Sequence, residues 1–170
     1  MTPIKKNILK TNVLTISSND CLNLVNLTQQ NFLKRSRICA HKDNEELIHE
    51  MIIHFSKDSY IRPHKHINKT ESYLILEGEV ELIYFSDEGK IIESHSLFSY
   101  KNAKENQNFY IRTSNILYHT LYIKSDYLLI LEITNGPFNK KESNFAEWAP
   151  ALEKEEEVKY FLNSLKQLYE

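Results

Sequence analysis

The sequence predicts an all-β domain, a barrel or sandwich of about eight short strands, with one helix before it and one after it. Between about Arg37 and about Phe138, β-branched and aromatic runs alternate with polar turns, which is typical of closed or double-sheet β folds. The chain has 170 residues, 41% of them hydrophobic, and this suits a single domain, 1–170, with one core. Only three glycines and four prolines are present, so Asn, Asp and Ser must form most of the turns.

The first element that we expect is a helix over about residues 19–35. Four consecutive polar residues, 17–20, are suitable N-caps. Apolar side chains then recur at helical spacing from Cys21 to Phe32. Lys34 and Arg35 follow, and basic side chains stabilise the negative end of a helix dipole.

The barrel that follows is expected over about residues 37–138. Short apolar runs predict strands, and polar residues 86–90 predict a hairpin turn. Asn135-Gly136-Pro137 ends the last strand. The predicted strand runs are 46–55, 59–66, 72–85, 109–113 and 118–123.

The last expected element is an amphipathic helix over about residues 153–169. Four glutamates lie near its beginning, where acidic side chains are favourable. One face of the helix carries an apolar stripe, which must pack on the barrel of its own chain or on a second subunit; we expect a homodimer. The stripe consists of Val158, Phe161, Leu162, Leu165, Leu168 and Tyr169.

Charge and hydropathy exclude several classes of partner. The formal net charge is −2, which argues against a nucleic-acid-binding surface or a polybasic membrane binder. The longest apolar run, Tyr127–Leu131, is far shorter than the roughly 20 residues that cross a bilayer. In residues 1–15, Lys10 and Asn12 interrupt the apolar positions, so we expect no secretory signal and a cytoplasmic protein.

The strongest chemical signal lies in the segment 62–78. His64 and His66 are two residues apart, so in a strand their side chains share one face and can chelate one ion. Glu71 follows after a four-residue turn and would lie beside them on an antiparallel neighbour. Gly78 then permits a tight reversal of the chain.

The spacing His-x-His-x4-Glu-x6-Gly resembles the first motif of the cupin superfamily. This resemblance implies a cupin double-stranded β-helix, a jelly-roll barrel, with one divalent metal. The superfamily's second motif supplies one more histidine, and His119 stands at its position, although Ser114 and Ile116 replace the expected Pro and Gly. The predicted metal ligands are therefore His64, His66, Glu71 and His119. His95 is the only other histidine after Gly78, and its polar surroundings make it the weaker candidate.

Further segments resemble the WbuC family of cupin-fold metalloproteins over roughly residues 20–150. The most specific are Asn135-Gly136-Pro137-Phe138 and Phe145-Ala146-Glu147-Trp148-Ala149-Pro150. The others are 37–41, 49–51 and 60–66. The resemblance implies a context in bacterial O-antigen and other surface-polysaccharide synthesis, without an established reaction.

Candidate pocket residues follow from strand alternation and residue choice. His49 lies among apolar side chains on one face of its run, Tyr60 and Arg62 would share the face of His64, and Tyr73 would share the face of Glu71. With only four arginines in a lysine-rich chain, Arg37 and Arg62 are candidates for binding a carboxylate or phosphate. Each of these residues has a packing role as its alternative.

Three imidazoles and one carboxylate suit Fe, Mn, Ni, Co or Zn and leave a coordination position open. We expect a metal-dependent enzyme, an isomerase or epimerase, acting on a small sugar-type or anionic metabolite. A non-catalytic ligand-binding or regulatory protein and an Fe(II) dioxygenase are the alternatives. Serine-nucleophile and phosphate-loop chemistry lack their motifs.

Overall fold

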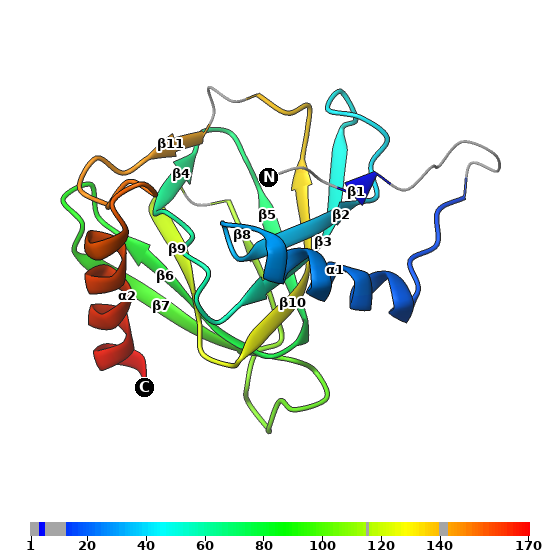
Figure 1. The fold of residues 1–170 in the computed structure, drawn as a ribbon. Helices are drawn as coiled ribbons and strands as arrows, with labels where there is room; N and C mark the ends of the chain where they lie inside the picture. Colours follow the sequence, from blue (N-terminus) through cyan, green and yellow to red (C-terminus); the bar gives the residue numbers. More distant parts are fainter. Residues whose placement is uncertain (1–3, 6–12, 115, 140–142) are drawn as a thin grey trace.

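The computed structural model describes residues 4–5, 13–114, 116–139 and 143–170, and shows two sheets, antiparallel except for the parallel pairing of the first two strands, flanked by two helices (Figure 1). The helices are α1 (Ser18–Gln30) and α2 (Glu155–Tyr169). The strands are β1 (Ile4–Lys5), β2 (Arg35–Cys39), β3 (Ile48–Ser56), β4 (His64–His66), β5 (Glu71–Glu77), β6 (Glu79–Phe85), β7 (Ile91–Phe98), β8 (Tyr110–Thr113), β9 (Tyr118–Ile123), β10 (Tyr127–Asn135) and β11 (Ser143–Phe145).

The order of the strands identifies the architecture. One sheet runs β1-β2-β3-β10-β5-β8 and the other β11-β4-β9-β6-β7. Numbered from β3, the eight central strands have the order 1-8-3-6 in the first sheet and 2-7-4-5 in the second, which is a jelly roll of two Greek keys. The predicted all-β fold, a double-stranded β-helix with a helix at each end, is confirmed.

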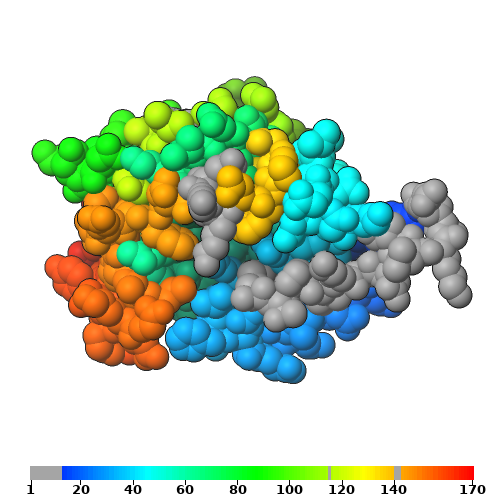
Figure 2. Space-filling view, turned by 90° about the horizontal axis from the view of Figure 1, so that it is seen from above, coloured from blue at the N-terminus to red at the C-terminus, as the bar shows by residue number. Residues whose placement is uncertain are grey.

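The core lies between the two sheets and is apolar at one end and polar at the other. In the first sheet, Ile53, Ile130 and Ile75 are cross-strand neighbours and all belong to the buried core. Four residues away on the same three strands, the inward-facing side chains are polar: they are His49, Thr134 and Glu71, which are again cross-strand neighbours. The polar end of the barrel therefore lies where β3 and β5 begin and β10 ends. Figure 2 looks onto this end, with the cyan segment before β3 on one side and the orange segment after β10 on the other.

Helix α1 begins where the sequence predicts but ends sooner. Ser17 caps it in a reciprocal capping box with Asp20. The helix stops at Gln30, because the Asn31 side chain bonds the backbone of Leu33 and Arg35 and turns the chain. The prediction that Lys34 and Arg35 form its basic end is wrong: Lys34 has φ +53° and Arg35 begins β2.

The strands also differ from the prediction in three places. The run 72–85 is two strands in different sheets, separated by Gly78 with φ +93°. An added Cβ at Gly78 would meet the carbonyl oxygen of Tyr127, so only glycine fits this corner. In the run 59–66, only β4 is a strand. The sequence analysis did not foresee β11, which pairs with β4.

Helix α2 packs on the outer face of the second sheet of its own chain (Figure 1). Leu165 is 3% exposed and lies in a cluster with Ile83, Phe85 and Tyr122. The apolar stripe thus has an intramolecular partner and no longer supports the homodimer, which stays a prediction. Among the described residues, no helix is long and apolar enough to span a membrane.

Candidate metal centre

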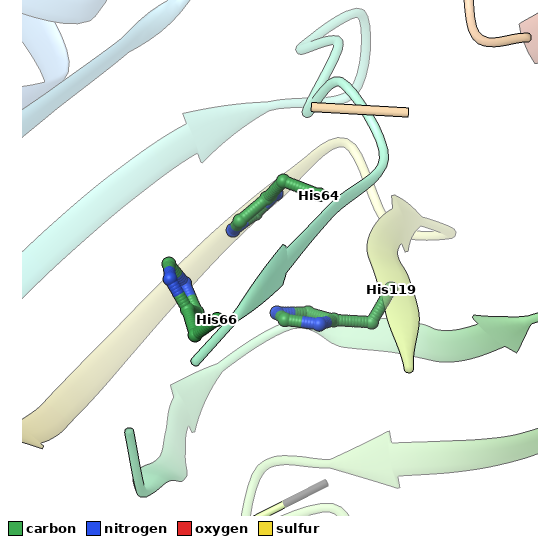
Figure 3. A group of neighbouring side chains, drawn as sticks. All are labelled: His64, His66 and His119. Atoms are coloured by element: carbon green, nitrogen blue, oxygen red, sulfur yellow. The ribbon is translucent and has the colours of Figure 1, made fainter. Parts of the chain in front are cut away.

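Three histidines converge at the polar end of the barrel (Figure 3). His64 and His66 project from β4, and His119 is the cross-strand neighbour of His64 on β9. One donor nitrogen of each lies within 4.8 Å of the other two. The two-residue spacing on β4 and the pairing of β4 with β9 place all three imidazoles on one face.

The Nδ1 atoms of these imidazoles already have partners. His64 Nδ1 lies 2.9 Å from the Arg62 carbonyl oxygen and His119 Nδ1 lies 3.3 Å from that of Leu117. Since a carbonyl only accepts, both imidazoles are protonated on Nδ1, which leaves Nε2 available for a further proton or a metal ion. His66 Nδ1 lies 2.9 Å from the Ser143 hydroxyl. Backbone and hydroxyl groups therefore aim the three Nε2 atoms inward.

Glu71 closes the group on one side. Its Oε1 lies 3.1 Å from His66 Nε2, and its Oε2 lies 3.2 Å from His119 Nε2. The Tyr73 hydroxyl donates a 2.9 Å hydrogen bond to Oε2. All four predicted ligands thus lie together, with Glu71 against two of the three imidazoles, while their role as metal ligands stays a prediction.

The surroundings set the charge of these groups. Burial, together with the charges of His119 and His66, lowers the pKa of His64 to about 3, so this imidazole is neutral at pH 7. Burial raises the pKa of Glu71, but the neighbouring imidazoles of His119 and His66 outweigh it and hold that pKa well below its ordinary value. Burial and the charge of Glu71 raise the pKa of Tyr73 well above its ordinary value. At neutral pH the site has an ionised carboxylate and a phenol that donates to it.

This donor set fits a divalent cation. His119 Nε2 is buried and makes no hydrogen bond of acceptable angle, although a carboxylate oxygen is near. Imidazole lone pairs that face a carboxylate repel it unless a proton or a cation lies between them. Neighbouring donors at about 2.1 Å from one ion lie about 3.0–3.4 Å apart in octahedral or tetrahedral geometry. The three nitrogens, which lie within 4.8 Å of one another, would therefore have to move closer together by up to about 2 Å to bind one.

A second group of charged side chains lines the first sheet beside this centre. Arg37 faces inward from β2, and its Nη1 lies 3.5 Å from Met51 Sδ while its Nε has no partner. Glu132 on β10 is the cross-strand neighbour of both Met51 and Tyr73. Burial, followed by the charge of Glu71, raises the pKa of Glu132 to about 7. Sequence reasoning missed Glu132, although it is the single charge in the apolar run 128–133.

Two predicted pocket residues, Arg62 and Tyr60, lie outside this group. Arg62 donates to the carbonyl oxygen of Ala146, stacks on the Phe145 ring and lines a separate pocket of about 190 Å³. The Tyr60 hydroxyl bonds the Pro150 carbonyl, and its ring packs against α2. Because residues 59–63 are not a strand, the alternation that would put both side chains on the face of His64 does not apply there.

The remaining histidines have other neighbours. His49 is on the inner face, as predicted, but its ring stacks on His41 with centroids 4.1 Å apart. Its Nε2 is buried without a hydrogen bond. His95, on β7, lies 2.9 Å from Glu93 and is not in the cluster. The geometry therefore favours His119 over His95.

Comparison with known proteins supports the fold. Residues 16–97, just under half of the chain, match a family described as "Domain of unknown function (DUF6016)". No curated protein matches the sequence. The structure of protein SO0799 from Shewanella oneidensis is similar, with 8% identity, a TM-score of 0.57, and 77% of this chain and 85% of that chain covered.

Two further solved structures cover less of the molecule. CapF in complex with 3-isopropenyl-tropolone is 12% identical with a TM-score of 0.50, over 65% of this chain and 34% of that one. An uncharacterised Klebsiella pneumoniae protein with a double-stranded β-helix domain is 12% identical with a TM-score of 0.48, over 65% of this chain and 78% of that chain. From its own strand order, the chain has the double-stranded β-helix fold of the cupins.

Proposed function

We propose that this protein binds one divalent transition metal through His64, His66, His119 and Glu71. The observation that carries the proposal is the orientation of the imidazoles: the Nδ1 atoms are taken up by carbonyl or hydroxyl groups, and the Nε2 atoms face one another beside a carboxylate. Fixing the far nitrogen in this way is how proteins orient metal-binding histidines. Fe, Mn, Ni, Co and Zn all accept this donor set.

We further propose that the site is catalytic and acts on a small sugar-type or anionic metabolite, by isomerisation or epimerisation. A bound divalent ion would supply Lewis-acid polarisation of a substrate oxygen. The chain contributes a phenol at Tyr73 that stays protonated and cationic Arg37 on the adjoining wall. The WbuC-like segments support a role in bacterial surface-polysaccharide biosynthesis.

Metal analysis of a double variant tests the binding proposal. We expect the parent protein to hold about one equivalent of metal and the His64→Ala/His66→Ala variant to hold none. Circular dichroism should show that the variant stays folded, because an apolar core of this size does not need a metal to form. Full metal content in the folded double variant would refute the assignment.

Turnover assays test the catalytic part. An isomerase should work with Mn, Ni or Zn and consume no oxygen, whereas a dioxygenase requires Fe(II) and oxygen. A sugar acid or sugar phosphate that binds to the metal-loaded protein and is never converted would overturn catalysis and leave metal binding intact.

A further inference from the structure

The inner wall formed by β2, β3 and β10 carries three charged side chains that the metal site does not use. They are Arg35, Arg37 and Glu132, and each lies opposite a core residue across the sheet: Phe55, Ile53 and Met51, respectively. Directly paired residues point to the same face of a sheet. All three therefore point into the barrel, away from α1, which covers the outer face through Ser36 and His54.

Glu132 interacts electrostatically with Arg35 and Arg37 without touching either of them. Within the described part of the chain, none of the three forms a salt bridge with either of the others. Among the described residues, the acceptor found for Arg37 is the thioether sulfur of Met51, and its Nε is buried without a partner. Charged groups inside a protein are normally paired or hydrogen-bonded, because removing them from water is costly. Each of the three side chains keeps part of its surface exposed although it faces inward, so the wall is only partly closed to solvent.

The wall is continuous with the metal centre. The Arg37 guanidinium reaches Met51, Met51 and Tyr73 flank Glu132 across the sheet, and the Tyr73 hydroxyl bonds Glu71. From Met51 to Tyr73 is two strand spacings, about 10 Å. A ligand the size of a sugar acid spans that distance.

We propose that Arg35, Arg37 and Glu132 are the substrate-recognition wall of this site, and that it takes a polyhydroxylated acid. The two guanidiniums bind its anionic group and Glu132 binds a hydroxyl group nearer the metal centre. This inference rests on the proposed function for the position of the metal. It adds to that function which part of the ligand each side chain binds. Guanidinium groups bind carboxylate or phosphate, and a carboxyl group binds hydroxyl groups.

Calorimetric titration with three related probes tests the wall. D-Gluconate, D-sorbitol and D-sorbitol 6-phosphate share a polyol chain and differ in the terminal group. We expect gluconate or sorbitol 6-phosphate to bind at least tenfold more tightly than sorbitol. The tighter of the two identifies the anion as carboxylate or phosphate. Equal affinity for all three would overturn the proposal.

Variants assign the contacts. Arg35→Gln and Arg37→Gln should each weaken binding of the preferred anion about 10- to 100-fold, and Glu132→Leu should weaken it about tenfold. The matched controls are Arg112→Gln and Glu50→Gln, which alter exposed residues and should leave affinity unchanged. Thermal melts should confirm that each variant is folded; unchanged affinity in folded Arg35→Gln and Arg37→Gln would refute the wall.

Repeating the titrations after removal of metal by chelation separates this inference from the proposed function. Loss of affinity in Arg37→Gln should persist in the metal-free protein, because the guanidinium acts on the far end of the ligand. If the parent protein holds no metal at all but binding depends on the arginines, the wall stands and the metal proposal fails. If metal binds as proposed but the arginine variants bind the preferred anion as tightly as the parent does, the recognition wall is refuted and the metal proposal stands.

Discussion

Tyr73 and Glu71, two residues apart on the inner face of β5, are joined by a 2.9 Å hydrogen bond from the phenol to Oε2 of the carboxylate. The same carboxylate faces His66 and His119. Tyr73 in turn neighbours Glu132 across the sheet. One phenol therefore lies between the carboxylate of the candidate metal centre and the charged inner wall.

Removing that phenol tests how far it orients Glu71. In Tyr73→Phe, we expect metal affinity to fall about tenfold, because groups that hydrogen-bond a ligating carboxylate typically contribute this much. Competition with a chromophoric chelator measures the affinity. Tyr110→Phe is the matched control. It also removes a tyrosine hydroxyl, which lies on β8 and donates to the Ser72 hydroxyl on β5. Equal affinities in the two variants would contradict an orienting role for Tyr73.

The choice between two histidines can be tested directly. His119→Ala should lose metal, because its Nε2 faces Glu71 and the other imidazoles. His95→Ala should keep about one equivalent, because His95 lies beside Glu93 on β7. Elemental analysis of both proteins gives the answer, and loss of metal in His95→Ala alone would overturn the assignment.

The raised pKa of Glu132 predicts a pH-dependent stability difference. Its carboxyl titrates at about 7 in the folded protein instead of the ordinary 4.5, because burial and then Glu71 raise the value, while Arg37, Lys69 and His119 lower it. Between these two pH values the folded chain binds a proton that the unfolded chain has lost, so Glu132 destabilises the fold increasingly as pH rises. Glu132→Gln removes this penalty.

We therefore expect metal-free Glu132→Gln to match the parent in free energy of unfolding near pH 4.5. The variant should exceed it by at most about 3 kcal/mol above pH 7, at about 1.4 kcal/mol for each unit of pKa shift. Urea denaturation across this range measures the difference. A constant difference at pH 4.5 and pH 8 would show that Glu132 titrates normally in the fold.

The packing of α2 on its own barrel predicts that replacing two of its leucines will lower the free energy of unfolding by different amounts. Leu165→Ala should lower the free energy of unfolding by about 2–4 kcal/mol, because Leu165 is 3% exposed among Ile83, Phe85 and Tyr122. Leu168→Ala, at a residue 64% exposed, should cost less than about 0.5 kcal/mol. Similar costs at the two positions would mean that α2 packs elsewhere.

Light scattering tests the homodimer separately. With α2 docked intramolecularly, a dimer would have to use another face. A single species of 20.1 kDa at all concentrations would refute it.

Local rules were enough to predict much of this protein. Because side chains alternate along a strand, the spacing of His64 and His66 predicted their common face, and the polar run 86–90 predicted the hairpin that joins β6 and β7. Ser17 was among the predicted caps and is the cap that forms. Each of these features depends on neighbours within a few residues, so the sequence alone contains the information.

Other features depended on which segments meet in three dimensions. Gly78 sends β5 and β6 into different sheets because its backbone must fit against Tyr127. Arg62 turns to the Ala146 carbonyl because the chain before β4 is not a strand. Arg35 faces the barrel interior because Asn31 ends α1 early. The sequence by itself determined which donor groups exist and their local spacing, whereas the tertiary structure decided which of them share one buried space, because that requires pairing between strands distant in sequence.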